Sequence, residues 1–186
     1  DEAVREIVAD LGRAEPMNRL LQADVGAGKT AVALFATLAV VAARKQAAWL
    51  APTEVLAAQH HARIATYLEG SRVRIGLLAG STSRAERDRM LKDAADGRLD
   101  LLIGTHAVLE EVVRFRDLAL AVIDEQQKFG VAQRNALRRK GHCPHTLVLT
   151  ATPIPRTLAL TVFGDLDVSS IRELPPGRRP VETRLV

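Results

Sequence analysis

The 186-residue sequence is poor in aromatic residues and cysteine, and it has no apolar run long enough to cross a membrane. Aromatic residues make up 3% of the chain, so its core must be aliphatic. The single cysteine, Cys143, excludes an internal disulfide and fits a reducing compartment, for which we expect a cytoplasmic protein. The longest apolar run, Ala31 to Ala43, is too short for a bilayer-spanning helix, so we expect no membrane partner.

Composition and length otherwise describe an ordinary globular protein. Hydrophobic residues make up 47% of the chain and charged residues 26%, and this length suits one domain. The net charge of +4 is compatible with nucleic-acid binding, although dispersed arginines often form only a solvated surface. The chain has no initial Met and opens in an apparent helix, so we expect it to be part of a longer protein.

Residues 23–30, Ala-Asp-Val-Gly-Ala-Gly-Lys-Thr, have the composition and context of a phosphate-binding loop. An apolar stretch at 20–22 predicts a strand before the loop, and residues 31–43 predict a helix after it. Gly26 and Gly28 allow the backbone to curl so that its N–H groups point at an anion. Lys29 can reach the β- and γ-phosphates, and the Thr30 hydroxyl can ligate Mg²⁺. The predicted nucleotide-binding residues are Asp24, Val25, Gly26, Ala27, Gly28, Lys29, Thr30 and Ala31.

Strand-like and helix-like stretches alternate along the chain. Short stretches rich in aliphatic and β-branched residues predict strands at 20–22, 47–51, 73–78, 101–103, 118–123, 146–149 and 167–171, and the run at 118–123 is continuously apolar. Helices are predicted at 31–43, 53–68, 83–97, from about 106, 131–140 and 155–163. This alternation predicts a doubly wound α/β fold, with a mainly parallel sheet covered by helices on both faces. We expect residues 1–174 to form this domain and 175–186, rich in Pro and Arg, to be a linker.

Two further motifs follow apolar strands. Asp124 and Glu125 stand at the carboxyl end of the strand at 118–123, where ligand sites of α/β proteins lie. Asp124 suits a Mg²⁺ contact through water, and Glu125 can orient or deprotonate an attacking water. After the next strand, the hydroxyls of Thr150-Ala151-Thr152 can bond the Gln127 side chain and sense the γ-phosphate.

These motifs occur in an order that resembles a superfamily 2 helicase. Motif I is the loop at 23–30, motif II begins at Asp124 and motif III is 150–152. Three shorter segments lie between motifs I and II, namely Pro52-Thr53-Glu54, Gly80-Ser81-Thr82 and Thr105-His106. Within that superfamily the chain is similar to the first motor lobe of the RecG family of ATP-dependent DNA helicases, which remodel stalled forks and junctions. The most specific stretch is Thr-Ala-Thr-Pro-Ile-Pro-Arg-Thr-Leu-Ala-Leu at 150–160. The chain departs from that family at Ala23, at Gln127, where His is usual, and at Lys128.

The resemblance implies a RecA-like P-loop fold, the cofactors ATP and Mg²⁺, and a role for each motif. Lys29, Asp124 and Glu125 would be catalytic, Thr30 and Asp124 would serve Mg²⁺, and Gln127, Thr150, Ala151 and Thr152 would couple hydrolysis to movement. Branched DNA, such as forks and Holliday-type junctions, would be held by its phosphates, which carry no sequence information. The implied DNA-binding residues are Pro52, Thr53, Glu54, Gly80, Ser81, Thr82, Thr105 and His106.

The resemblance also implies partners in the same parent chain. We expect an adenine-reading Gln before Asp1, a second motor lobe that supplies arginine fingers, and a wedge domain that splits the duplex. Three other interpretations stay open from sequence: the motor lobe of a translocase like the transcription–repair coupling factor, a non-hydrolysing nucleic-acid-binding module, and a different P-loop enzyme such as a GTPase, a transporter ATPase or a small-molecule kinase. Neither a GTPase nor a transporter ATPase explains the Thr-Ala-Thr-Pro-Ile-Pro stretch at 150–155.

Overall fold

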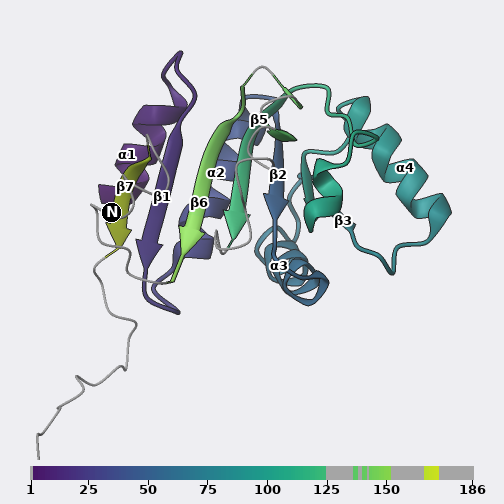
Figure 1. Ribbon diagram of the computed structural model, residues 1–186, viewed down its shortest axis with the longest axis horizontal. Coiled ribbons are helices and arrows are strands. Elements are labelled where there is room, and N and C mark those ends of the chain that lie inside the picture. The colour runs from purple at the N-terminus through teal and green to yellow at the C-terminus, as the bar shows by residue number, and fades with distance from the viewer. Residues whose placement is uncertain (1, 125–135, 138–139, 142, 152–165, 172–186) are drawn as a thin grey trace, which may run out of the picture.

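A seven-stranded sheet, in which every pair of neighbouring strands is parallel, organises the chain (Figure 1). The computed structural model describes residues 2–124, 136–137, 140–141, 143–151 and 166–171. Its strands are β1 (Asn18–Ala23), β2 (Gln46–Leu50), β3 (Ile75–Leu78), β4 (Leu101–Gly104), β5 (Leu118–Asp124), β6 (His145–Thr150) and β7 (Asp167–Ile171). They lie in the order β3-β4-β2-β5-β6-β1-β7, so β6 separates β1 from β5.

Helices connect the strands and cover the sheet. They are α1 (Glu2–Leu11), α2 (Lys29–Ala42), α3 (Glu54–Tyr67), α4 (Arg84–Ala95) and the short 3₁₀ helix η1 (His106–Leu109). No helix among the described residues is long and apolar enough to cross a membrane. Two parallel strands can be joined only by a segment that crosses back over the sheet. Each such connection therefore places its helix on one face of the sheet.

The core consists of two aliphatic layers, one on each face of the sheet. Successive residues of a strand point to opposite faces, so neighbours such as Leu20 and Leu21 enter different layers. One layer packs the sheet against α1, α2 and α3, and the other packs it against α4 and η1. Every residue of β2 and β4 is buried, which explains why these strands show no polar alternation. The predicted doubly wound, parallel fold with helices on both faces is confirmed.

Local sequence signals set the helix ends. Ser83 and Glu86 form a reciprocal capping box at the start of α4, since the Ser83 hydroxyl accepts from the Glu86 N–H and the Glu86 carboxylate accepts from the Ser83 N–H. Thr53 caps α3 by accepting from the Leu56 N–H. The predicted strands and helices within the described residues are present, and their ends differ from the predicted ones by no more than two residues. The predictions for 131–135, 155–163 and 175–186 lie outside the described residues.

Gln46 closes the amino-terminal end of the sheet with a buried amide. Its Nε2 donates to the carbonyl oxygens of Ala94 and Leu99, at 2.9 and 2.7 Å, and its Oε1 accepts from the Asp117 N–H at 3.0 Å. The side chain thereby joins β2 to the end of α4 and the start of β5.

Replacing Gln46 by Ala should therefore destabilise the fold. Buried backbone groups would lose their partners, and each such loss costs about 1–3 kcal/mol, so we expect the free energy of unfolding to fall by about 2–4 kcal/mol. Urea unfolding of the variant measures this, with Gln59→Ala, at an exposed position of α3, as the matched control. Equal stability of the two variants would contradict the assigned role.

Candidate functional site

The loop between β1 and α2 has the shape of an anion cradle. Gly26 and Gly28 have φ values of 84° and 90°, in the left-handed region that residues with a side chain rarely adopt. A Cβ built on Gly28 meets nothing within 4 Å, so the space before the first turn of α2 is open. The loop thus brings the N-terminus of a 14-residue helix, with its partial positive charge, to an exposed position.

Lys29 is held across the mouth of this loop. Its Nζ donates to the carbonyl oxygens of Ala23 and Asp24, at 2.6 and 2.9 Å. These carbonyls belong to the end of β1 and the first loop residue, so the ammonium group lies over the loop backbone rather than in bulk solvent. This arrangement places a positive charge beside the open N-terminus of α2, as a triphosphate site requires.

Asp124 lies near the loop because of the strand order. Leu149 of β6 pairs with Leu21 of β1 on one side and with Asp124 of β5 on the other. Neighbouring strands are about 4.8 Å apart, so β1 and β5 end about 10 Å apart at the same edge of the sheet. Along β5, alternate side chains face opposite layers, and Asp124 follows Leu120 and Val122 toward the face covered by α2 and α3. The site therefore combines the loop, the start of α2 and one carboxylate.

The strand between them carries the third motif. Thr150 ends β6, is buried, and pairs with Gln22 of β1. Ala151 follows it and is partly exposed. The structure therefore places the first two residues of the predicted coupling motif between the strands that carry the loop and Asp124. The other predicted site residues Glu125, Gln127 and Thr152 lie outside the described residues.

His60 is a member of this site that the sequence did not reveal. From the sequence it was expected only as a residue of the helix after Pro52-Thr53-Glu54, but its Nε2 lies 2.7 Å from Oδ2 of Asp124. Both side chains are largely buried, at 14% and 16% exposed. No local pattern could have indicated this pair, because it depends on α3 following a strand that is the neighbour of β5.

The predicted nucleic-acid contacts also gather at the carboxyl edge of the sheet. Pro52, Thr53 and Glu54 follow β2, and Gly80 follows β3. The Glu54 carboxylate accepts from the Gly80 N–H at 2.9 Å, which joins two of the predicted motifs. A Cβ on Gly80 would lie 2.5 Å from that carboxylate oxygen, so a side chain there would disturb the contact.

The remaining predicted contacts differ in how accessible they are. Ser81 and His106 are exposed and could meet a ligand. The Thr82 hydroxyl accepts from the Ala79 N–H and donates to the Leu77 carbonyl, so it shapes the turn. Thr105 is buried before η1. The exposed side chains of Thr53, Ser81 and His106, which follow three different strands, suit contact with phosphates.

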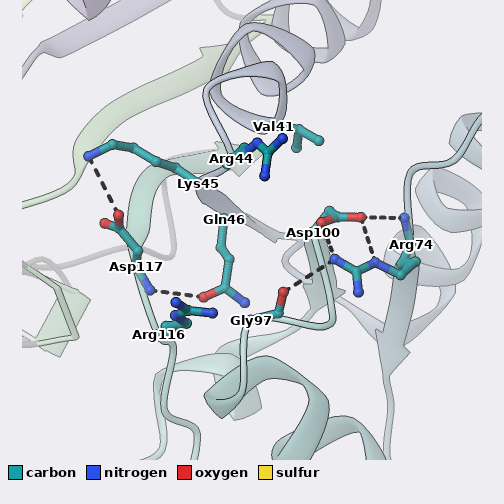
Figure 2. A pocket seen from close by; sticks show the side chains of 9 residues that line it. All are labelled: Val41, Arg44, Lys45, Gln46, Arg74, Gly97, Asp100, Arg116 and Asp117. Carbon is teal, nitrogen blue, oxygen red and sulfur yellow. Dashed lines mark hydrogen bonds and ion pairs between the residues drawn. The ribbon is translucent and has the colours of Figure 1, made fainter.

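A separate hollow of about 470 Å³ lies at the opposite end of the sheet (Figure 2). Its lining includes residues that directly precede strands, such as Arg74, Asp100 and Asp117. Burial raises the pKa of Asp100, but hydrogen bonds to Arg74 outweigh burial and hold that pKa below its ordinary value. Lys45 pairs with Asp117 at 3.6 Å. Both carboxylates of the lining therefore have a basic partner, and the lining also includes Arg44 and Arg116.

Comparison with known proteins places this chain in a family. Residues 2–161 match the model of the DEAD/DEAH box helicase family. The chain is 54% identical to the ATP-dependent DNA helicase RecG of Acidithiobacillus ferridurans, 52% to that of Synechocystis sp. and 49% to that of Bacillus subtilis. These alignments cover 98%, 98% and 97% of this chain, but only 27%, 22% and 26% of the relatives. The chain therefore spans about a quarter of the length of these curated relatives.

Solved structures agree with the sequence comparison. A structure of RecG bound to a three-way DNA junction matches 97% of this chain with a TM-score of 0.84 and 41% identity, and the match covers 24% of that protein. The Pyrococcus furiosus Hef helicase domain matches with a TM-score of 0.65 and 21% identity over 90% of this chain and 38% of its own, which shows the shared fold alone. The predicted resemblance to the RecG family is confirmed.

Proposed function

Since this chain belongs to the DEAD/DEAH box helicase family, we propose that it is the ATP-binding first motor lobe of a DNA helicase that remodels branched DNA. The observation that carries the proposal is the convergence of the loop at 23–30 and Asp124 at one edge of the sheet, with Thr150 on the strand between them. The similarity to proteins named ATP-dependent DNA helicase RecG supports DNA as the substrate, and a RecG structure with a three-way junction supports branched DNA.

The loop would bind the triphosphate of ATP. Its backbone N–H groups and the N-terminus of α2 favour negative charge at the open space before Gly28. Lys29 would exchange the carbonyl oxygens of Ala23 and Asp24 for phosphate oxygens, which are stronger acceptors for an ammonium group. The residues 24–31 are assigned to this role.

The donors at the site also fit Mg²⁺, which prefers oxygen ligands and retains several waters. The Thr30 hydroxyl stands in the first turn of α2, and the Asp124 carboxylate approaches from the end of β5. We assign Thr30 as a direct ligand and Asp124 as an acceptor for metal-bound water. When bound, the ion would neutralise charge that develops on the phosphates.

Hydrolysis requires a group that handles the attacking water, and we assign this role to Glu125, directly after Asp124. The γ-phosphate would be sensed by Gln127, Thr150, Ala151 and Thr152. These residues would couple its release to a change at the edge of the sheet that contacts DNA. There, residues 52–54, 80–82 and 105–106 would hold DNA through its phosphates. A second motor lobe and a wedge domain in the same parent chain would complete the machine.

Lys29→Ala should weaken nucleotide binding by this chain at least tenfold. The substitution removes the cation that the loop holds beside the phosphate space, and a charge-assisted hydrogen bond contributes about 1.5–3 kcal/mol, which corresponds to about 10–150-fold. Titration of fluorescently labelled ADP with Mg²⁺ into both proteins measures the difference.

Lys45→Ala is the matched control, because Lys45 lies at the opposite end of the sheet beside Asp117. Its affinity should equal that of the unmodified chain. If Lys29→Ala bound the labelled nucleotide as tightly as the unmodified chain, the assignment of the phosphate loop would be wrong.

A further inference from the structure

His60 contacts the carboxylate that the proposed function assigns to the metal. Its Nε2 lies 2.7 Å from Oδ2 of Asp124, and both side chains are mostly withdrawn from solvent. The contact is a hydrogen bond when Nε2 carries the imidazole proton, because a carboxylate oxygen can then accept from it. The contact links α3 to the end of β5. These elements are far apart in sequence, but α3 follows β2, which is the neighbour of β5 in the sheet.

A second contact fixes the orientation of the imidazole. The His60 ring packs against Trp49 with the ring centroids 5.5 Å apart and the planes tilted by 37°. Trp49 is fully buried in β2 and pairs with Val122, two residues before Asp124. The ring of His60 therefore has a contact on two sides, with a fully buried indole and with the carboxylate itself.

We propose that His60 is a positioning residue that holds Asp124 for Mg²⁺ binding. By engaging Oδ2, it fixes the carboxylate plane and leaves Oδ1 to accept from the hydrated ion. Hydrogen-bond partners of metal-binding carboxylates commonly contribute about 10–100-fold in metal affinity or activity. This inference rests on the proposed function, since it assumes that Asp124 serves the metal of a bound nucleotide.

The test measures how much Mg²⁺ tightens the binding of labelled ADP to this chain. In the unmodified chain, adding Mg²⁺ should increase affinity. His60→Ala should reduce this Mg²⁺-dependent gain about tenfold and leave the affinity without Mg²⁺ within about twofold. His60→Gln should recover a measurable part of the gain, because an amide N–H can donate to Oδ2. His61→Ala, a half-buried neighbour on the same helix, should behave as the unmodified chain.

A double-mutant cycle separates positioning from packing. Asp124→Asn should lose the Mg²⁺-dependent gain, and adding His60→Ala to it should cause no further loss, because the two residues act as one unit. The proposal would be overturned if the two substitutions reduced the Mg²⁺-dependent gain additively, or if His60→Ala left that gain unchanged. It would also be overturned if His60→Ala reduced ADP affinity equally with and without Mg²⁺.

The same titrations distinguish this inference from the proposed function. If the unmodified chain bound no nucleotide, or bound it equally well after Lys29→Ala, both would fail. If binding depended on Lys29 and the Mg²⁺-dependent gain did not change in His60→Ala, only the role of His60 would be wrong. If binding depended on Lys29 but no Mg²⁺-dependent gain appeared, the metal roles of Thr30 and Asp124 would fail together with that of His60.

Discussion

Replacing Glu125 by Gln in the longer parent protein should reduce steady-state ATP turnover by about 10²–10⁴-fold, the usual contribution of a positioned general base. Glu125 directly follows Asp124, which lies at the carboxyl edge of the sheet beside the loop that we assign to the phosphates. The Gln side chain has the same shape but cannot accept a proton from water. ATP affinity should change little, because the loop at 23–30 and Lys29 are unaltered.

Two measurements check this expectation, namely phosphate release under saturating ATP and DNA, and equilibrium binding of labelled ATP. Glu111→Gln is the matched control, since Glu111 is exposed and lies away from the strand ends that form the site. Asp124→Asn should differ from Glu125→Gln by also weakening the dependence on Mg²⁺. If Glu125→Gln retained most of the steady-state turnover, the water-activating group would have to be sought elsewhere.

The fold could be predicted from the sequence because its signals are local and agree with one another. The aliphatic run at 118–123 has no polar alternation, which indicates a strand buried on both faces. The capping box at Ser83 and the cap at Thr53 mark helix starts by chemistry that needs no tertiary partner. The loop at 23–30 is equally local, since its glycines and Lys29 define both shape and charge.

Contacts between distant segments could not be predicted in the same way. Arg19 is an example, because a charged residue within a buried strand gives no hint of its partners. Its side chain is 10% exposed and donates to Asp10 at 2.7 Å and to the Ser169 hydroxyl at 2.8 Å. Asp10 belongs to α1, and Ser169 belongs to β7, 150 residues after Arg19 in the sequence. Both partners offset the free-energy cost of burying the guanidinium charge.

His60 illustrates the same limit at the site itself. Its position after a predicted motif indicates a helix, and an ordinary place on that helix is the simplest interpretation of one histidine. The contact with Asp124 follows only from the order β2-β5-β6-β1, which hydrophobic periodicity does not encode. Sequence motifs thus predicted the candidate phosphate loop and Asp124, whereas only the strand order explains why His60 lies against Asp124.

The isolated 186-residue chain should neither unwind DNA nor hydrolyse ATP at a useful rate. It offers the phosphate loop, Asp124 and Glu125, but the proposed motor also needs an arginine from a second lobe for the transition-state charge. Such an arginine contributes about 10³–10⁵-fold in rate, so we expect turnover to fall below that of the parent by a factor of this size. Unwinding should be absent, because the motor moves by closing two lobes on ATP.

DNA binding by the isolated chain should be weak and independent of sequence. Its candidate contacts, at 52–54, 80–82 and 105–106, would meet phosphates, so affinity should fall steeply as salt is added. The decisive measurement is DNA-stimulated phosphate release and fork unwinding by the chain alone, with the rest of the parent protein added in trans as the comparison. Robust DNA-stimulated turnover by the chain alone would show that one lobe carries a complete active site, and the proposed division of labour between lobes would be wrong.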